Sequence, residues 1–585
     1  MLPIGHRIRF EYEILGSGVR GGHGPPISSC MRSILAPIAS CLLLLACDGG
    51  TTGGSAAVDT GTFDGAPDDA PAETGTDGGD DVAACTSDVT PRPGTVVTDR
   101  GAVTGFEAGA TWAYLGIPFA APPTGPLRFK PPIPASCWKG ERAAKDWGPT
   151  CPQSDETGKA PVTGDEDCLQ LNVWTPKAAT GPLPVMVWIH GGGFVAGSAT
   201  QLTLGTRLYD AQKLAEKSNV VVVTINYRLG VLGYLAHPLL DAEDPHKASG
   251  NYGMLDQVAA LQWVQRNAAA FSGDPSRVTI FGESAGGANV CSLVASPLAK
   301  GLFTGAIMES GGCVAHAQSD AEAMGAKIVT AAKCDAAGDV LACLRALSAA
   351  DMVNAYPVTV DVAGAGNGYG STIDGWFLSG KPLDIIAAGG HNHVPMIVGT
   401  NSDETSRSVP LAVDASATDY QNAVRALFPT TADAVLSHYP VTDYPSPWAA
   451  YVALTSDAKF ICGARKAARA LGDGQDEPVF RYDFTHALEN APKLKGFGAW
   501  HGSDVLYVFD HLDLGGYVAS AGERTIVDVF QGAWGRLATT GDPNGGGLPT
   551  WQAWTSADPY LRIDAPPTAA TGLRTSQCDF WDTLL

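Results

Sequence analysis

The most constraining feature of the sequence is a serine framed by glycines where a predicted strand meets a predicted helix. Residues Gly282–Gly286 read Gly-Glu-Ser-Ala-Gly, follow the β-branched run Val278–Phe281 and open the segment Gly287–Cys291. A serine at such a junction adopts a strained backbone conformation, and the flanking glycines leave room for strand and helix to cross. The pattern therefore predicts a nucleophile elbow, with Ser284 exposed above a sheet.

A glycine run after a second predicted strand supports the prediction of a nucleophile elbow. The motif alone is weak evidence, because 70 of the 585 residues are glycine and chance should yield about half a match. Upstream, Leu183–Ile189 reads as a buried strand and leads into His190–Phe194, which contains three successive glycines. A backbone without side chains can point N–H groups at a developing oxyanion, although a plain flexible turn would read the same way.

Length and composition favour one large folded domain. Enzymes of the α/β class often form a single large sheet domain, and nothing after Cys85 resembles a linker in this chain of 585 residues. Hydrophobic residues make up 45% of the chain, which is ordinary for a globular protein with an ample core. The formal net charge of −22 argues against a nucleic acid as partner.

The first 84 residues are predicted to lie outside the folded domain. Residues 1–30 have no clear apolar period and read as an upstream extension or a disordered segment. Residues 31–47 resemble a secretory signal whose apolar run is too short to span a bilayer. The signal ends in Leu-Leu-Ala-Cys, similar to a bacterial lipobox, so Cys47 is predicted to carry a lipid anchor; an ordinary signal peptide containing Cys47 is the alternative. Residues 48–84 hold nine acidic residues and no Lys or Arg, which predicts a disordered acidic tether.

The cysteine count predicts disulfides in an exported protein, either a membrane-anchored lipoprotein or a periplasmic or secreted one. Of thirteen cysteines, three lie in or before the lipobox, which leaves an even ten for the folded domain. Short spacing suggests two pairs without fixing them. These are Cys151 with Cys168, and Cys334 with Cys343.

Four further stretches resemble the signatures of one enzyme family. They are Gly116–Ala120, Glu166–Val173, Gly250–Gln257 and Phe271–Pro275. Together with the elbow, they make the chain similar to the type B carboxylesterases, which include the cholinesterases. The resemblance runs from about residue 90 to the C-terminus. It implies the α/β-hydrolase fold, in which helices flank a large, mostly parallel central sheet, and a single catalytic domain at 85–585.

The resemblance also implies a catalytic triad, whose members follow in the order serine, acid, histidine in this fold. In a loop after a predicted strand, Glu404 matches the acid position of the family, and Asp403 beside it is the alternative. His501 matches the family's histidine loop, whereas the competing His190 precedes the serine in the chain. By this reading Ser284 attacks an ester carbonyl, His501 transfers the proton to the leaving alcohol, Glu404 orients the imidazole, and water then repeats the cycle.

The resemblance assigns an oxyanion hole to the backbone N–H groups of Gly192, Gly193 and Ala285. Each such donor lowers the barrier by about 3 kcal/mol. Ala285 also lies at a predicted helix N-terminus, where the helix dipole favours negative charge. Glu283 and Ser310 resemble secondary active-site positions of the family.

The family pattern further implies disulfides and buried salt bridges. It pairs Cys151 with Cys168, Cys334 with Cys343, and Cys462 with Cys578. It pairs Arg128 with Glu166, and Arg228 with Asp256. No partner can be assigned to Cys85, Cys137, Cys291 or Cys313.

One departure from the cholinesterases bears on the substrate. Cholinesterases hold a quaternary ammonium against a tryptophan in the loop closed by the first disulfide, but residues 152–167 contain no aromatic residue. We therefore expect hydrolysis of neutral short- to medium-chain esters, without cofactor or metal. Trp376 and Phe377 either line the acyl side or are buried in the core. His391 and His393 lack further ligands for a metal site and read as solvated loop residues.

Three alternatives remain open from the sequence. The same triad could hydrolyse an amide or a carbamate, or act as a lipase. Some members of this fold family have lost the serine or histidine and act only as adhesion proteins, but all three triad positions are filled here. We expect a monomer.

Overall fold

A large mixed sheet organises the computed structural model, which describes residues 84–155, 158–357 and 368–584. Its strands, in spatial order, are β18 (Thr568–Thr571), β17 (Pro559–Ile563), β16 (Val479–Phe484), β15 (Met396–Asn401), β12 (Gly305–Glu309), β11 (Gly273–Glu283), β7 (Leu183–Ile189), β10 (Val221–Ile225), β6 (Gln170–Pro176), β4 (Thr111–Pro118) and β3 (Phe106–Ala108). The strands from β17 to β10 run parallel, and the strands at both edges run antiparallel to their neighbours. The predicted signal, Cys47 and the tether as far as residue 83 lie outside the described residues.

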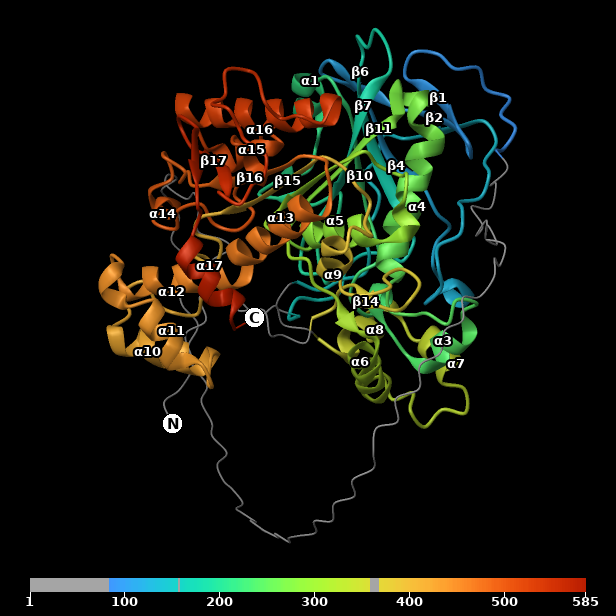
Figure 1. Cartoon of the computed structure of the whole chain (residues 1–585). Helices are drawn as coiled ribbons and strands as arrows, with labels where there is room; N and C mark the ends of the chain where they lie inside the picture. Colours follow the sequence, from blue (N-terminus) through green and yellow to red (C-terminus); the bar gives the residue numbers. More distant parts are fainter. Residues whose placement is uncertain (1–83, 156–157, 358–367, 585) are drawn as a thin grey trace, which may run out of the picture. The chain divides into compact units, whose positions relative to one another are not determined.

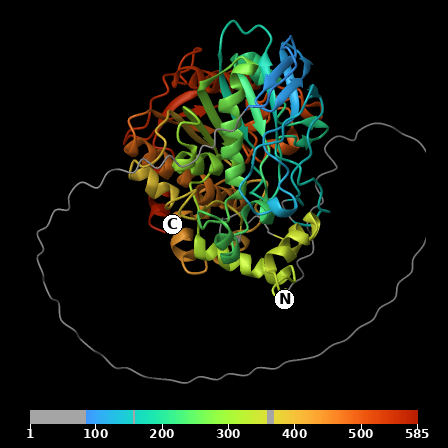
Figure 2. The ribbon, with the colours of Figure 1, turned by 90° about the vertical axis from the view of Figure 1, so that its right-hand side faces the viewer.

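Both faces of the sheet are buried, as expected for parallel strands that read as continuous apolar runs. In β7, Val185 and Val187 face one core while Met186 and Trp188 face the other. The first core is covered by α4 (Tyr252–Asn267), α5 (Ala285–Ala295), α9 (Pro382–Ala387) and α13 (Cys462–Gly474). The second is covered by α1 (Gln212–Ser218), α15 (Val505–Val508) and α16 (Ala521–Thr540). Figure 1 shows α16 and α4 on opposite sides of the sheet, and Figure 2 shows the same layers after a quarter turn.

Smaller elements surround these layers. A separate sheet near the N-terminal end contains β1 (Thr95–Thr98), β2 (Gly101–Thr104) and β5 (Glu141–Ala143). Two short pairs are β8 (Leu202–Thr203) with β9 (Thr206–Arg207), and β13 (His316–Ala317) with β14 (Thr372–Ile373). Further helices are α2 (Gly230–Tyr234), α3 (Pro238–Glu243), α6 (Gln318–Ala331), α7 (Val340–Ala346), α8 (Ala349–Ala355) and α14 (Pro492–Lys495).

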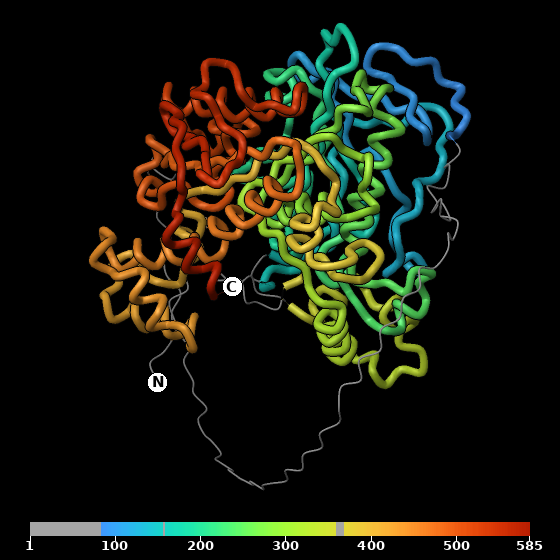
Figure 3. The backbone as a smooth tube through the Cα atoms, in the orientation of Figure 1, coloured from blue at the N-terminus to red at the C-terminus, as the bar shows by residue number. Residues whose placement is uncertain are grey.

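A third core lies between α10 (Ala417–Leu427), α11 (Ala432–His438), α12 (Pro447–Ser456) and the last helix, α17 (Thr575–Asp582). Here Trp581 Nε1 donates to Tyr439 Oη at 2.7 Å, and a disulfide joins Cys462 to Cys578. Figure 3 shows the tube of the C-terminal segment returning to this helical module. The last helix is therefore attached to the rest of the domain by both a covalent bond and aromatic packing.

The helix before the elbow strand is continued by a short 3₁₀ turn. Helix α4 ends at Asn267 and is followed by a 3₁₀ turn, η2 (Ala268–Phe271). Asn267 Nδ2 donates to Trp263 O at 2.9 Å and to Asp99 Oδ1 at 3.0 Å, which anchors the helix end. Most residues of α4 are buried, because the helix is enclosed on more than one side.

Five disulfides cross-link the described residues. They join Cys85 to Cys137, Cys151 to Cys168, Cys291 to Cys313, Cys334 to Cys343, and Cys462 to Cys578. The four cysteines without an assigned partner thus form two further bonds. Such a set is typical of proteins that mature outside the cytoplasm. Among the described residues, no helix has both the length and the apolar character needed to cross a membrane.

Candidate active site

Ser284 lies at the sharp turn between β11 and α5, as the motif predicts. Its backbone has φ 59° and ψ −122°, in the left-handed half of conformational space that non-glycine residues rarely adopt. A Cβ at Gly282 would lie 2.6 Å from Ile189 O, and one at Gly286 would lie 2.0 Å from the same oxygen. Only glycine fits at these positions, because β7 passes directly against the turn.

The glycine loop after β7 lies against this turn. A Cβ at Gly191 would lie 3.0 Å from Ser284 Cβ, so loop and serine are in close contact. Gly192 and Gly193 have φ values of 106° and 61°. Within the residues that the structure describes, the N–H groups of Gly192, Gly193 and Ala285 donate no hydrogen bond to the protein. Three donors beside the serine are therefore available to an incoming oxyanion.

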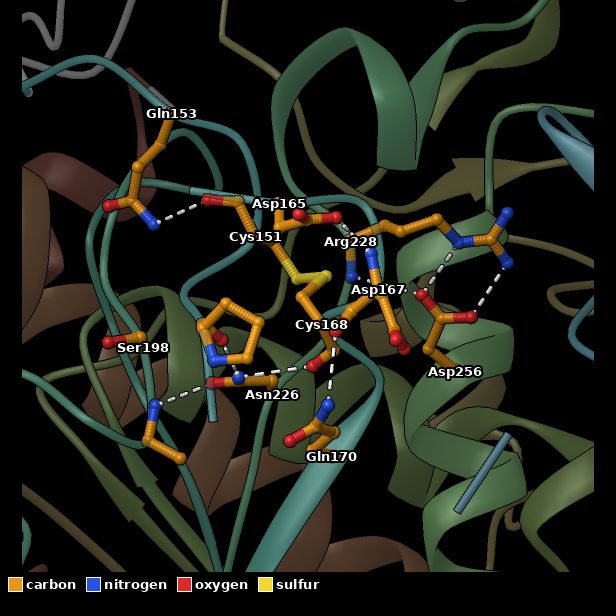
Figure 4. The surroundings of a disulfide bond; sticks show 12 residues. Cys151, Gln153, Asp165, Asp167, Cys168, Gln170, Ser198, Asn226, Arg228 and Asp256 are labelled. Carbon is orange, nitrogen blue, oxygen red and sulfur yellow. Dashed lines mark hydrogen bonds and ion pairs between the residues drawn. A yellow bond between two sulfur atoms is a disulfide. The ribbon is translucent and has the colours of Figure 1, made fainter. Parts of the chain in front are cut away.

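The loop closed by the Cys151–Cys168 disulfide, whose surroundings Figure 4 shows, contacts the segment that follows the glycine loop. Gln153 Nε2 donates to Gly197 O at 2.9 Å, and Gly197 N donates to Gln153 Oε1 at 2.8 Å. Asn226 Nδ2 donates to Cys168 O at 3.1 Å, and its Oδ1 accepts from Ala199 N at 2.8 Å. These paired bonds connect the disulfide region to the far end of the glycine loop and restrict its movement.

Glu404 and His501 form the closest polar contact of the predicted triad. Glu404 Oε2 lies 2.7 Å from His501 Nδ1, and Glu404 is 1% exposed. Its other oxygen accepts from Ser310 Oγ at 2.5 Å and from Asn401 N at 2.8 Å. Both oxygens of the carboxylate are thus in polar contacts, which fix its orientation.

The neighbouring carboxylate points elsewhere. Asp403 Oδ2 accepts from Ser402 Oγ at 2.6 Å and from Ala499 N at 3.3 Å. Asp403 therefore ties the acid loop to the histidine loop through the backbone, and Glu404 alone of the two contacts the imidazole.

The second nitrogen of His501 faces the elbow. Nε2 lies 3.3 Å from Glu283 Oε1, and no hydrogen bond joins it to Ser284 Oγ in the described residues. Catalytic contacts of this kind often tighten only when substrate binds. Burial lowers the pKa of His501, but the carboxylates of Glu283 and Glu404 outweigh it and raise the pKa to about 9. The ring of Phe460 packs against the imidazole at a centroid distance of 4.5 Å.

The other histidines considered from the sequence have structural surroundings. His190 stacks on Tyr227 at 4.4 Å, with Nδ1 2.8 Å from Gly191 O, and burial lowers its pKa to about 4. It is a neutral ring beneath the glycine loop. His391 Nε2 contacts Gln475 Oε1 at 3.0 Å, and His393 Nε2 contacts Gly389 O at 3.0 Å. No cluster of three or more metal ligands occurs among the described residues.

Two buried acids behind the site have no signature in the sequence. Asp504 accepts from Asn401 Nδ2 at 3.0 Å and from Tyr482 Oη at 3.1 Å, and burial raises its pKa to about 6. Glu309 accepts from Trp534 Nε1 at 2.7 Å, and burial holds its pKa well above the usual range. Asp504 follows His501 by three residues, which is the only signal that could have pointed to it.

Comparison with known proteins places this geometry in a family. The model of the carboxylesterase family matches residues 92–581. The chain belongs to the carboxylesterase family. It is 35% identical to human cocaine esterase over 534 residues, which cover 84% of this chain and 89% of that enzyme. It is 34% identical to fumonisin B1 esterase of Sphingopyxis macrogoltabida over 495 residues, covering 82% and 88% of the two chains. A medium-chain fatty acyl-CoA hydrolase precursor of Anas platyrhynchos is 35% identical, with 83% and 91% covered.

These matches confirm the predicted type B carboxylesterase family, its α/β-hydrolase fold, and the assignment of the protein as a carboxylic ester hydrolase. The carboxylesterase also contains the two implied salt bridges. Arg128 Nε lies 2.8 Å from Glu166 Oε1, and Arg228 Nη2 lies 2.7 Å from Asp256 Oδ1. Figure 4 shows the pair Arg228–Asp256 near the Cys151–Cys168 disulfide.

The two aromatic residues considered for the acyl side of the carboxylesterase differ from each other. Phe377 is fully buried in the core. Trp376 is partly exposed and stacks on His246 at 3.9 Å, with the ring planes 6° apart. Neither contact involves the triad residues, so the structure supports the core reading for Phe377.

Proposed function

We propose that Ser284 is the nucleophile of this esterase, His501 its general base and Glu404 the residue that orients the base. Ser284 Oγ attacks the ester carbonyl while His501 Nε2 accepts its proton and returns it to the leaving alcohol. Water then attacks the acyl-enzyme with the same assistance, which regenerates the serine. Glu404 holds the imidazole in place and stabilises the imidazolium that forms in each half-reaction.

We further propose that Gly192, Gly193 and Ala285 form the oxyanion hole. Among the described residues, no protein atom accepts from their N–H groups, and the glycine loop lies against the serine. Donors held in place before the reaction need no reorganisation when negative charge develops on the carbonyl oxygen. Ala285 also begins helix α5, whose dipole favours an anion at this end.

The observation that carries the proposal is the 2.7 Å contact between Glu404 and His501 beside a strained serine turn. Strain of this kind persists only where surrounding structure enforces it, and it is concentrated at functional sites. The carboxylate, the imidazole and the serine come from three separate segments, which follow β15, helix α14 and β11. The arrangement fits acyl transfer without a cofactor.

For the substrate, we propose neutral short- to medium-chain carboxylic esters. The disulfide loop at 152–167 has no aromatic ring to hold a quaternary ammonium. Carboxylates surround the imidazole, and ionised acyl groups would be repelled by Glu283 beside the serine. The names of the three relatives state an ester or acyl substrate, which supports ester hydrolysis.

The nucleophile is tested by replacing Ser284 with alanine and assaying a chromogenic short-chain aryl ester. We expect kcat to fall by roughly 10⁴-fold or more while the unfolding transition is preserved. An organophosphate should label the unmodified chain at Ser284 and leave the variant unlabelled. Near-normal turnover in Ser284→Ala would refute the mechanism, and a parallel panel of amides and carbamates would show whether esters are preferred.

The acid is tested by a matched pair of variants in one loop. Glu404→Gln should lower kcat by about 10⁴-fold, as loss of the orienting carboxylate does in related triads. Asp403→Asn should cost little, because asparagine keeps an oxygen for the bonds from Ser402 and Ala499. The reverse pattern would identify Asp403 as the acid.

We also propose that the enzyme is a monomer outside the cytoplasm, anchored by a lipid on Cys47. Five disulfides in the described residues support maturation in an oxidising compartment. The lipobox-like Leu-Leu-Ala-Cys sequence supports the anchor.

A further inference from the structure

A second cavity lies on the far side of the acid loop, between strands β16 and β17 and the start of α17. Its volume is about 330 Å³, within the usual range of small-molecule sites. Its polar lining consists of Ser402, Asp483, Thr485, Tyr560, Arg562 and Arg574. None of these side chains belongs to the proposed catalytic machinery, so the cavity needs its own explanation.

Asp483 is the most unusual of these residues. It is 4% exposed, and its Oδ1 is buried without a hydrogen-bond partner among the described residues. Burial raises its pKa to about 7, against the opposing effect of Arg574 and Arg562. A buried carboxylate oxygen without a donor costs free energy, so a site of this kind favours a guest that supplies an N–H or O–H.

Two arginines line the same cavity. Arg562 is the register partner of Asp483 in the parallel pair β16–β17, so both side chains lie on one face of the sheet. Arg562 is exposed, and its Nη2 donates to Tyr560 Oη at 3.3 Å. Arg574 lies 3.4 Å from Asp457 through Nε. No ion pair within 4.0 Å joins Asp483 to either arginine in the described part of the chain.

The arginines and the unpaired carboxylate oxygen indicate which functional groups a ligand of this cavity would carry. Guanidinium groups bind carboxylates, with two parallel hydrogen bonds where geometry allows. The unpaired oxygen of Asp483 requires a donor close to that carboxylate. Water alone would satisfy the oxygen, but Arg562, which has no ion pair among the described residues, would then remain without an anion, whereas Arg574 already lies near Asp457.

We propose that the cavity lined by Asp483, Arg562 and Arg574 binds a small carboxylate that bears an α-hydroxyl or α-ammonium group. The arginines hold the carboxylate, and Asp483 accepts from the neighbouring O–H or N–H. The site adjoins the catalytic loop, because Ser402 lines the cavity and donates to Asp403, the neighbour of Glu404.

Three acids with the same carbon skeleton test the proposal: L-lactate, L-alanine and propionate. Binding to the full chain is measured by isothermal titration calorimetry. We expect L-lactate or L-alanine to bind about tenfold more tightly than propionate, which lacks the α-donor. The hydroxy acid and the amino acid distinguish the two sources of the donor.

Variants assign the binding to this cavity. Arg562→Gln should weaken all bound acids by about tenfold or more, because a charge-assisted bond is lost. Asp483→Asn should abolish the preference over propionate. Arg425→Gln, which removes an exposed arginine on α10, is the matched control and should change neither property. Ser284→Ala should bind all acids like the unmodified chain, which separates this cavity from the proposed active site.

Several results would overturn the proposal. These are no binding of any acid at millimolar concentrations, equal affinity for propionate, an equal loss in Arg425→Gln, or loss of binding in Ser284→Ala. Because calorimetry does not depend on turnover, failure here leaves the ester hydrolase assignment untouched.

Discussion

At the level of single residues, the environment of His501, the proposed general base, bears on the pH dependence of the esterase. Burial disfavours the imidazolium, but Glu283 and Glu404 favour it more strongly and raise the pKa of His501 to about 9. A general base must be neutral before it accepts a proton. With His501 in the proposed role, we therefore expect activity to increase as the pH rises towards this pKa.

This balance predicts the effect of Glu283→Gln on the pH profile of kcat/KM. Removing the carboxylate 3.3 Å from Nε2 destabilises the imidazolium, so the pKa of His501 falls. The ascending limb of kcat/KM, which reports the free enzyme, should therefore move to lower pH. Asp403→Asn is the control, because Asp403 does not contact the imidazole. The ascending limb of the kcat/KM profile of this variant should therefore lie at the same pH as in the unmodified enzyme. A limb that is unchanged or moves upward in Glu283→Gln would contradict the assignment.

The raised pKa of His501 also affects the stability of the fold. Because the folded-state pKa of His501 is raised, its contribution to the free energy of unfolding is complete below the ordinary value of about 6.5. That contribution is lost as the pH rises to about 9. The stabilisation should end at a lower pH in Glu283→Gln, as a series of denaturant titrations would show.

At the level of elements, the elbow depends on the close crossing of β7, β11 and α5. A Cβ at Gly286 would lie 2.0 Å from Ile189 O and 2.9 Å from Ile189 C, so strand and helix would have to separate. We expect Gly286→Ala to lower the free energy of unfolding by about 3 kcal/mol and to reduce turnover.

Gly181→Ala provides the control for that prediction, since a Cβ at Gly181 meets no atom within 4 Å. Denaturant unfolding of both variants should show a loss for Gly286→Ala alone. Equal stability of the two variants would mean that the crossing is looser than the structure indicates.

The motifs around the elbow could be predicted from the sequence, whereas several tertiary contacts could not. The elbow, the glycine run and the acid loop are local patterns, so they predicted the fold and the residues that the structure brings to one sheet edge. Asp504 and Glu309 carry no local pattern, because the contacts that bury them come from β15, β16 and α16. The pairs Cys85–Cys137 and Cys291–Cys313 likewise depend on the tertiary fold.

At the level of the whole molecule, covalent links join segments that lie far apart in the sequence. The bond Cys462–Cys578 spans 116 residues and attaches α17 to α13, whereas Cys334–Cys343 spans only 9. In the chain-entropy account, a longer closed loop restricts the unfolded chain more strongly.

We therefore predict that Cys462→Ala with Cys578→Ala lowers the free energy of unfolding by about 5 kcal/mol, and that the pair Cys334→Ala with Cys343→Ala lowers it by about 3 kcal/mol. Chemical denaturation under non-reducing conditions would measure both. A larger loss for the short loop would show that local packing, rather than loop closure, determines the contribution of these bonds.

The last prediction concerns where the molecule is held. If Cys47 carries a lipid, the enzyme should fractionate with membranes, and Cys47→Ser should release it by blocking lipid attachment and normal processing. Mass spectrometry of the mature N-terminus is the direct measurement. A lipid-modified Cys47 is expected, and an unmodified residue at another position would mean a secreted enzyme whose catalytic chemistry is unchanged.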